Sequence, residues 1–432
     1  MNLLVDVIIC GASRLNGAIK APPSKSLTHR ALIASTLSDG TSVIKNPLIC
    51  DDTIATLNAC HMIGANIKKK DDSLEVRGCS RLRTPEDVID CRDSASTMRF
   101  MTPICALADG ISILTGRKSL RRRPMKPLLD AMRSLGVKCY SARGDGYPPV
   151  IVFGGGLNGG RASIRGDISS QFISGLLFSS PMAQKDTEID VTTRLESKPY
   201  IEATMNVLRR HGVEIKASRD YRTFQIPCRQ KYEPSNHIIE GDYSSAAFIL
   251  AAAAVTDSKV KVRNLKGDSI QGDRAFVDIL KEAGVYVKVG KDFVEVEGSS
   301  DLKPFNIDLK DNPDLVPACA AIACFIRGKS IIRGVKRLRF KESNRISSLL
   351  SEFAKIGAKI SSVDNAITIK GGEEIRGADL HSHNDHRIAM ACMVVALGAE
   401  GKSIVRGIEC INKSYPNFLR DITSLGAEII ER

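Results

Sequence analysis

Hydroxyl and basic side chains gather where several predicted helices begin. The segment Pro22-Pro23-Ser24-Lys25-Ser26 leads into Leu27-Thr28-His29-Arg30-Ala31-Leu32, which we predict to be helical. Backbone N–H groups at a helix start favour an anion, a serine can cap them, and Lys25 and Arg30 would add positive charge. A similar pattern recurs in three segments: Asp93-Ser94-Ala95-Ser96-Thr97-Met98-Arg99, Ile168-Ser169-Ser170-Gln171-Phe172 and Ser197-Lys198-Pro199-Tyr200. Taken singly, the segments at 22–32 and 93–99 are more typical of ordinary capped helices than of anion sites.

Acidic side chains accompany cations in the second half of the chain. Asp314 precedes an Ala- and Cys-rich predicted helix, and Lys341-Glu342-Ser343-Asn344-Arg345 opens another predicted helix. On that helix Lys341 and Arg345 would share a face, with Glu342 about 100° away. A salt-bridged surface turn is the alternative interpretation. Two further polar segments follow: His383-Asn384-Asp385-His386-Arg387 and Asn412-Lys413-Ser414-Tyr415-Pro416.

Metal and nucleic-acid sites are less well supported. His381, His383 and His386 are spaced as metal ligands can be, but no Cys is near and an Arg follows, so we expect no metal. The net charge of +13 and the basic runs 68–70 and 121–126 suggest a phosphate-backbone surface, yet the chain has no Trp and 5% aromatic residues for base stacking. We therefore expect no nucleic-acid partner, and interpret Arg123, ahead of a predicted helix, as a ligand for a small anion.

Composition predicts a cytoplasmic protein. No apolar run approaches the roughly 18 residues of a membrane span, and residues 1–17 lack the basic start of a signal peptide. The twelve Cys are scattered without a C-x-x-C pair, which indicates reduced, buried thiols. The Gly-rich stretch 154–160 lacks the Lys-Ser/Thr of a phosphate loop, and we predict a turn there.

One pattern recurs six times and must position these groups. An amphipathic segment runs into a Gly and then into a short β-branched strand, at intervals of roughly 70 residues. Gly accepts the left-handed conformation that often ends a helix. The sequence therefore predicts two lobes, each with three copies of a βα unit around a pseudo-threefold axis. The six glycines are Gly64, Gly136, Gly212, Gly284, Gly357 and Gly426.

Ten segments in order carry a resemblance to a known family: PPSKSLTHRAL, SASTMR, RRRPMKPLLDAM, SSQF, SKPYI, EGDYSSAAFILAAA, PDLVPACAAIA, KESNRI, NDHRIAMA and NKSYPNFL. From end to end the chain resembles the 5-enolpyruvylshikimate-3-phosphate (EPSP) synthase, or 3-phosphoshikimate 1-carboxyvinyltransferase, family. The resemblance implies an α/β fold of two inverted lobes, each of three βαβαββ units, that close on the substrates. It implies one lobe of residues 21–238 with hydroxyls for shikimate phosphate, and one of residues 1–20 plus 239–432 with the catalytic acids.

The resemblance also implies the reaction. The enolpyruvyl group of phosphoenolpyruvate passes to the 5-hydroxyl of 3-phosphoshikimate, with release of phosphate through a tetrahedral ketal, on the shikimate pathway to chorismate and aromatic amino acids. It implies a monomer without metal or cofactor. Asp314 would be the base and Glu342 the acid, with Lys25 also catalytic. By the same resemblance, 3-phosphoshikimate would contact Lys25, Ser26, Arg30, Ser169, Ser170, Gln171, Ser197, Asp314 and Lys341. Phosphoenolpyruvate would contact Lys25, Ala95, Arg123, Gln171, Arg345, His386, Arg387 and Lys413.

The chain departs from the family pattern at three places. Ala95 stands where the family most often has Gly, and we expect its methyl to narrow the phosphoenolpyruvate pocket and to lower sensitivity to glyphosate. Gly116-Arg117-Lys118 replaces a frequent Gly-Asp, and Arg337 replaces a frequent Asn, which leaves that contact to shikimate phosphate open. Two alternatives are a UDP-N-acetylglucosamine enolpyruvyl transferase, whose Lys-Asn pair and loop Cys are missing from this sequence, and an RNA 3′-phosphate cyclase-like protein.

Overall fold

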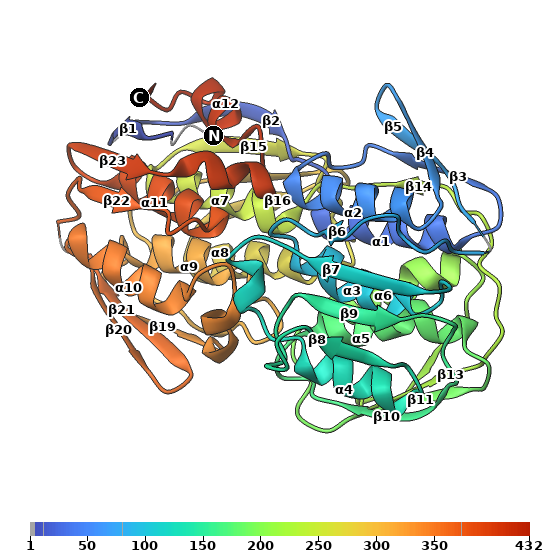
Figure 1. Ribbon diagram of the computed structural model, residues 1–432. Coiled ribbons are helices and arrows are strands. Elements are labelled where there is room, and N and C mark those ends of the chain that lie inside the picture. The colour runs from blue at the N-terminus through green and yellow to red at the C-terminus, as the bar shows by residue number, and fades with distance from the viewer. Residues whose placement is uncertain (1–4, 12, 80, 373) are drawn as a thin grey trace. The chain divides into compact units, whose positions relative to one another are not determined.

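The chain forms two compact units. The computed structural model describes residues 5–11, 13–79, 81–372 and 374–432 (Figure 1). One unit, here the continuous unit, is Ser24–Ile239; the other, here the split unit, combines the residues up to Pro23 with Glu240–Arg432. No helix within the described ranges is long and apolar enough to cross a membrane.

Each unit contains three four-stranded sheets in the described part of the chain, and all of them share one strand pattern. A parallel pair is followed by two antiparallel neighbours. In the continuous unit the sheets are β14(His237–Ile238)-β3(Thr41–Lys45)-β5(Ser73–Arg77)-β4(Asn66–Lys70), β6(Ile89–Asp90)-β7(Ile111–Thr115)-β9(Val150–Phe153)-β8(Cys139–Ser141) and β10(Gly160–Ile164)-β11(Thr187–Val191)-β13(Thr223–Ile226)-β12(Lys216–Ala217). In the split unit they are β2(Asn16–Lys20)-β15(Lys259–Arg263)-β17(Phe293–Glu297)-β16(Tyr286–Val289), β18(Asn306–Asp308)-β19(Gly328–Arg333)-β21(Ala366–Gly371)-β20(Lys359–Val363) and β22(Asp379–His381)-β23(Lys402–Arg406)-β1(Val7–Cys10)-β24(Ile429–Glu431).

Three sheets are completed by strands from distant parts of the sequence. β1 lies between β23 and β24, with Val7 opposite Val405 and Glu431. β2 pairs in parallel with β15, with Ile19 opposite Val262. β14 pairs in parallel with β3 and completes the continuous unit. These long-range pairings place both ends of the chain in the split unit.

Two kinds of helix cover the sheets. The helices α2(Asp51–Met62), α4(Lys126–Ser134), α6(Lys198–Arg210), α8(Phe276–Glu282), α10(Arg345–Lys355) and α12(Phe418–Ser424) bury one face. The helices α1(Lys25–Leu37), α3(Ala95–Cys105), α5(Ser170–Ser179), α7(Tyr243–Val255), α9(Val316–Ala323) and α11(His386–Gly398) are buried almost all round, which explains their apolar and small residues. In the split unit α7, α9 and α11 pack against one another (Figure 1).

The predicted repeat is confirmed. All six marker glycines have positive φ, from +74° at Gly212 to +114° at Gly64, and each lies two positions after the last residue of a one-sided helix. A Cβ-bearing residue would be strained there. In the fourth copy the strand after the glycine is β16, whose alternate residues Val287 and Val289 pack, partly buried, against the core. The stretch from Gly154 to Gly159 is an irregular connection ahead of β10, as predicted.

Candidate active site

The carboxylate of Asp314 lies among three cations of the split unit. Its Oδ1 accepts from Nη1 of Arg345 at 2.9 Å and from Nζ of Lys341 at 3.2 Å. Its Oδ2 accepts from Nη2 of Arg387 at 3.0 Å. Asp314 immediately precedes the α9 region, and its side chain is 19% exposed. The geometry therefore gathers four of the predicted site residues, which come from three separate segments of the sequence.

Arg345 connects Asp314 to two further carboxylates. Its Nη2 donates to Glu342 at 2.7 Å, and its Nε donates to Asp385 at 2.8 Å. Nζ of Lys413 lies 3.3 Å from the other oxygen of Glu342. The Arg345 side chain at the centre of this network is 1% exposed, whereas Asp314 is 19% exposed. A buried charge needs such partners because desolvation alone is costly.

The elements that carry these groups are fixed at their N-termini. Asp385 caps α11 by accepting from the backbone N–H of Arg387, and Asp242 caps α7 by accepting from that of Ser245. His386 is the first residue of α11 and is buried. Lys413 ends the 3₁₀ helix η5 (Ile408–Lys413) and is also buried. Helix starts therefore supply much of this cluster, and their positive ends favour anions.

One sequence prediction was wrong. Lys341 and Glu342 do not lie on the helix of the fifth repeat, because α10 begins only at Arg345, with Asn344 as its N-cap. Lys341 has extended backbone angles and is the C-cap residue directly after the 3₁₀ helix η4 (Lys336–Phe340). Lys341 and Arg345 still meet, but they do so at the shared carboxylate of Asp314 rather than along a helix face.

Burial and charge set the protonation of this cluster. Burial would raise the pKa of Asp314, but Arg387, Lys341 and Arg345 together hold that pKa well below its usual range. Burial lowers the pKa of Lys341 to about 8, and the neighbouring guanidinium groups act in the same direction against the attraction of Asp314. Asp314 is therefore ionised at neutral pH, as a proton acceptor must be.

The continuous unit presents hydroxyls at helix starts. Ser24 caps α1 through the backbone N–H of Leu27, and Lys25 is the first residue of that helix. Nζ of Lys25 donates to Asp52 at 2.9 Å. Ser197 precedes α6 with φ of 59°, a left-handed conformation in which its side chain makes no capping bond. This strained position is one of those that the sequence analysis selected.

Arg30 has extensive contacts with the protein itself. Its three nitrogen atoms donate to the hydroxyl of Thr204 at 2.8 Å, the carbonyl of Ser26 at 2.8 Å and the carbonyl of Tyr200 at 2.9 Å. Burial lowers its pKa to about 10. These contacts tie α1 to the start of α6, so Arg30 positions the helix that follows Ser197.

Ser169 and Gln171 share a partner that the sequence analysis did not select. Nη1 of Arg99 donates to Oγ of Ser169 at 3.0 Å and to Oε1 of Gln171 at 2.9 Å. Nε2 of Gln171 donates to Oγ of Ser96 at 2.8 Å. Ser169 also caps α5. Arg99 closes the quoted segment SASTMR, one turn into α3, and a buried arginine in an apolar helix was the signal that could have found it.

The remaining predicted residues also lie at element ends. Ala95 is the first residue of α3, and Ser170 is the first residue of α5. Arg123 follows the 3₁₀ helix η1 (Leu120–Arg122) and is 5% exposed. Arg337, at the departure from the family pattern, donates to the carbonyl of Lys310 at 2.7 Å. Most of the predicted residues thus lie at helix starts or in the turns before them; Arg30, in the second turn of α1, and Lys413, at the end of η5, are exceptions.

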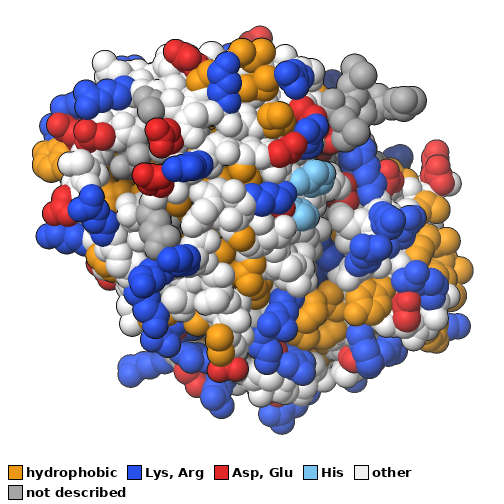
Figure 2. All heavy atoms as spheres, turned by 90° about the vertical axis from the view of Figure 1, so that its left-hand side faces the viewer, with side chains coloured by type: hydrophobic (Ala, Val, Ile, Leu, Met, Phe, Trp, Pro, Cys, Tyr) orange, Lys and Arg blue, Asp and Glu red, His pale blue; other side chains and the backbone are white. Residues whose placement is uncertain are grey.

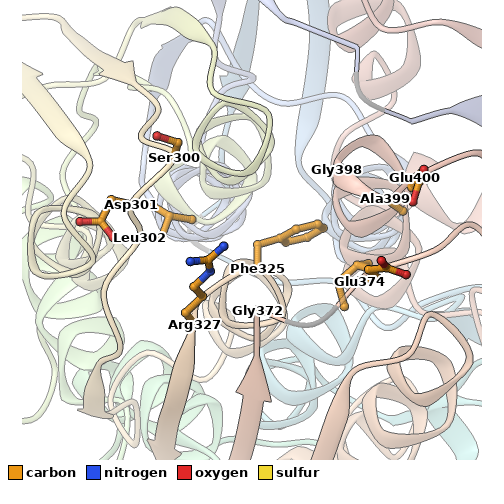
Figure 3. Close-up of a pocket in the computed structure, with 11 residues that line it drawn as sticks. Ser300, Asp301, Leu302, Phe325, Arg327, Gly372, Glu374, Gly398, Ala399 and Glu400 are labelled. Carbon is orange, nitrogen blue, oxygen red and sulfur yellow. The ribbon is translucent and has the colours of Figure 1, made fainter.

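A pocket of about 500 Å³ lies elsewhere in the split unit (Figure 3). Phe325 and Gly398 line it, at the C-terminal ends of α9 and α11, while the Asp314 cluster lies at their N-terminal ends. Arg327, Asp301 and Glu374 form its polar margin (Figure 3). None of its lining residues belongs to the predicted site.

Known structures share this architecture. An EPSP synthase from Acinetobacter baumannii superposes with a TM-score of 0.83 at 24% identity, over 99% of this chain and 100% of that one. The enolpyruvyl transferase NikO from Streptomyces tendae gives 0.80 at 19% identity, over 99% of both chains. The fold is therefore that of the enolpyruvyl transferases.

Sequence comparison narrows the class. A family model for EPSP synthase (3-phosphoshikimate 1-carboxyvinyltransferase) matches residues 9–422. The 3-phosphoshikimate 1-carboxyvinyltransferase of Methanocaldococcus jannaschii is 42% identical over 98% of this chain and 99% of the relative. The 3-phosphoshikimate 1-carboxyvinyltransferase of Methanosphaera stadtmanae is 39% identical over 99% of this chain and 100% of the relative. The chain belongs to the EPSP synthase family, which decides against both alternatives raised by the sequence.

Proposed function

We propose that the helix-start residues and the Asp314 cluster carry out the reaction of this family. The reaction transfers the enolpyruvyl group of phosphoenolpyruvate to 3-phosphoshikimate on the shikimate pathway to aromatic amino acids. The observation that carries the assignment is one carboxylate, Asp314, held by three cations at the start of a buried helix. The acceptor is the 5-hydroxyl, and the products include inorganic phosphate.

The substrates bring two phosphates and two carboxylates, and the side chains match these groups. In the continuous unit Lys25, Ser26, Arg30, Ser169, Ser170, Gln171 and Ser197 bind 3-phosphoshikimate, and in the split unit Lys341 and Asp314 do so. Phosphoenolpyruvate is bound by Lys25, Arg123 and Gln171, beside Ala95, and by Arg345, His386, Arg387 and Lys413. Planar guanidinium groups suit carboxylate and phosphate because they can donate two parallel hydrogen bonds.

Asp314 takes the proton of the attacking hydroxyl. Its depressed pKa makes it a weak base while Arg387, Lys341 and Arg345 all face it. Each cation that turns toward a substrate anion withdraws part of that stabilisation, so substrate binding strengthens the base. Basicity then develops only when both reactants are present, which limits unproductive proton transfer.

Glu342 supplies the proton that C3 of phosphoenolpyruvate gains. The 5-oxygen bonds to C2 as the C2–C3 double bond takes up this proton, and a tetrahedral ketal results. The ketal then loses phosphate from C2, with the proton held by Asp314 passing to that leaving group, and returns a proton from C3 to Glu342, which restores the double bond. Lys413 and Arg345 hold Glu342 in place for both steps at 3.3 Å and 2.7 Å. Base and acid need different surroundings, because one must be ionised while the other donates.

We also propose that the protein acts as a monomer in the cytoplasm. All predicted residues come from one chain, so the scheme needs no second copy. All twelve cysteines are free thiols and eight are buried, which suits a reducing compartment.

The test is phosphate release from phosphoenolpyruvate that depends on 3-phosphoshikimate. We expect Asp314→Asn and Glu342→Gln each to lower kcat about 10²- to 10⁴-fold, the usual range for acid–base groups. Asp301→Asn and Glu374→Gln, acids of the separate pocket, are matched controls and should retain the wild-type rate. Wild-type rates in the first two variants would refute the acid–base assignment, and release without 3-phosphoshikimate would refute the substrate assignment.

A further inference from the structure

A buried carboxyl group outside this scheme lies beside the proposed base. Asp273 belongs to the 3₁₀ helix η3 (Gly272–Ala275) in the split unit and is 2% exposed. The Oγ of Ser244 donates to its Oδ2, and Nδ2 of Asn312 donates to its Oδ1 at 3.1 Å. Both carboxylate oxygens therefore have a donor from another element.

These two donors lead to both sides of the Asp314–Arg387 ion pair. Asn312 is two residues before Asp314, and its carbonyl accepts from the N–H of Leu315 at 3.0 Å in the turn that presents the carboxylate. The carbonyl of Ser244 accepts from Nη1 of Arg387 at 3.3 Å, while Nη2 of the same guanidinium reaches Asp314 at 3.0 Å. Asp273 thus holds the turn that carries the base and the residue that orients its cation.

Charge couples the same groups. The ionisable side chains facing Asp273 are Asp314 from the turn before α9, Arg387 from α11 and the thiol of Cys319 from α9. Burial, and then the charge of Asp314, raise the pKa of Asp273 to about 6, against the hydrogen bonds and Arg387. Burial raises the pKa of Cys319 so far that its thiol stays neutral. Asp273 therefore changes charge within the working range of an enzyme, and Cys319 does not.

We propose that Asp273 is a positioning residue for the enolpyruvyl transfer: it holds the Asp314 turn and Arg387 in their reactive arrangement, and its negative charge makes Asp314 a stronger base. This role builds on the one proposed for Asp314. A negative neighbour disfavours the charged form of a carboxylate, so an ionised Asp273 raises the pKa of Asp314. Because a base is more effective as its pKa approaches the working pH, activity should rise as Asp273 loses its proton.

Asp273→Asn isolates the charge from the hydrogen bonds. The amide oxygen can accept from Asn312, and the amide nitrogen can donate to Ser244, whose hydroxyl can turn to accept. We expect wild-type kcat/KM for phosphoenolpyruvate to rise with pH through an inflection near 6. In Asp273→Asn this inflection should be missing, kcat at pH 8 should be roughly tenfold lower, and the two proteins should converge near pH 5. Thermal unfolding should give a Tm close to that of the wild type.

Ser244→Ala gives a second measurement that does not alter Asp273. Loss of this hydroxyl removes a bond that stabilises the ionised carboxylate, so the inflection should move to higher pH by up to about one unit. A wild-type rate and profile in Asp273→Asn would overturn the proposal. So would a uniform loss of rate with the inflection retained, since that describes a structural role only. If Asp314→Asn keeps full activity, the assignment of the base fails, and that outcome is separate from a failure at Asp273.

Discussion

The methyl group of Ala95 lies at the first position of α3, where a substrate anion is expected to meet the helix. Ala95 is 6% exposed and precedes Ser96, which accepts a hydrogen bond from Gln171. A single methyl group in a tight pocket changes binding by about 1–3 kcal/mol, because the neighbours cannot move away freely. We therefore expect Ala95 to discriminate between phosphoenolpyruvate and bulkier anions.

Ala95→Gly should increase sensitivity to glyphosate. We expect the inhibitor concentration for half-maximal inhibition to fall roughly tenfold or more, while KM for phosphoenolpyruvate changes less. Inhibition is measured by phosphate release at fixed substrate. Ala106→Gly, at the other end of α3, removes a buried methyl group away from the predicted site and should leave inhibition unchanged. An unchanged response in Ala95→Gly would show that the methyl group does not limit access.

At this scale, the residue types marked candidate side chains and the family resemblance assigned them to one site, but neither predicted how these side chains connect. Asp314, Lys341, Arg345 and Arg387 were selected from the sequence, and the structure brings them together. Arg99 and Asp273 were missed. Arg99 bonds to Ser169 and Asp273 bonds to Ser244, partners that are about 30 or more residues away, and no spacing within one segment reveals such a pairing.

Two helices of the continuous unit approach each other closely at a glycine. A Cβ on Gly175 in α5 would lie 2.4 Å from the carbonyl oxygen of Arg99 in α3 and 3.2 Å from Cγ of Pro103. The backbone of α3 cannot move away from such a methyl group as the end of a flexible side chain could. Gly175 therefore sets the distance between the helix that begins with Ser170 and the helix that carries Arg99.

Gly175→Ala should separate α5 from α3. We expect a loss of about 1–3 kcal/mol in the free energy of unfolding, the usual cost of overpacking, and a higher KM for 3-phosphoshikimate because Ser169 and Gln171 move with α5. Urea unfolding and steady-state kinetics measure the two effects. In Gly144→Ala the new methyl group meets nothing within 4 Å, so that control should show only left-handed backbone strain and an unchanged KM. Equal stability and KM in Gly175→Ala and the wild type would contradict this packing role.

Element boundaries were predictable where local chemistry marks them. The six helices that end in left-handed glycines were predicted because a one-sided apolar pattern and a glycine act within one segment. The start of α10 was misplaced, since Lys341-Glu342-Ser343 has helical spacing. The cap at Asn344, which accepts from the N–H of Ser347 at 3.4 Å, begins the helix later.

The whole molecule carries a net charge of +13. On the face drawn in Figure 2, Lys and Arg side chains are spread widely, with acidic side chains among them. A positive field raises the encounter rate with polyanionic substrates, and salt screens it over about 10 Å at 0.1 M. The surplus of cations therefore acts on association as well as on the bound state.

Added sodium chloride should lower kcat/KM and leave kcat nearly constant. Between about 50 and 300 mM salt we expect roughly a threefold or larger decrease in kcat/KM for both substrates, since encounter is screened while bound groups are enclosed. Initial rates at low and saturating substrate separate the two parameters. A kcat/KM that is independent of salt would exclude steering by the net charge.

At the scale of the whole molecule, the sequence pattern alone does not predict which distant strands pair. Nothing local in Val7–Cys10 identifies Lys402–Val405 as its partner, because any alternating apolar strand could occupy that position between β23 and β24. The assignment of an N-terminal strand to a C-terminal sheet came from the family resemblance. Nonlocal pairing is a property of the assembled sheets, and short-range periodicity cannot encode it.

The strand order also determines when each sheet can be completed during translation. The ribosome has delivered every strand of the continuous unit once β14 emerges. By contrast, β1 must wait for β23 and β24, which are translated last, and β2 must wait for β15, which follows β14 in the sequence. At about 5–20 residues per second, this wait lasts tens of seconds. Nascent chains therefore expose the unpaired strands β1 and β2 while the continuous unit folds. The N-terminal segment is where chaperones have most to protect.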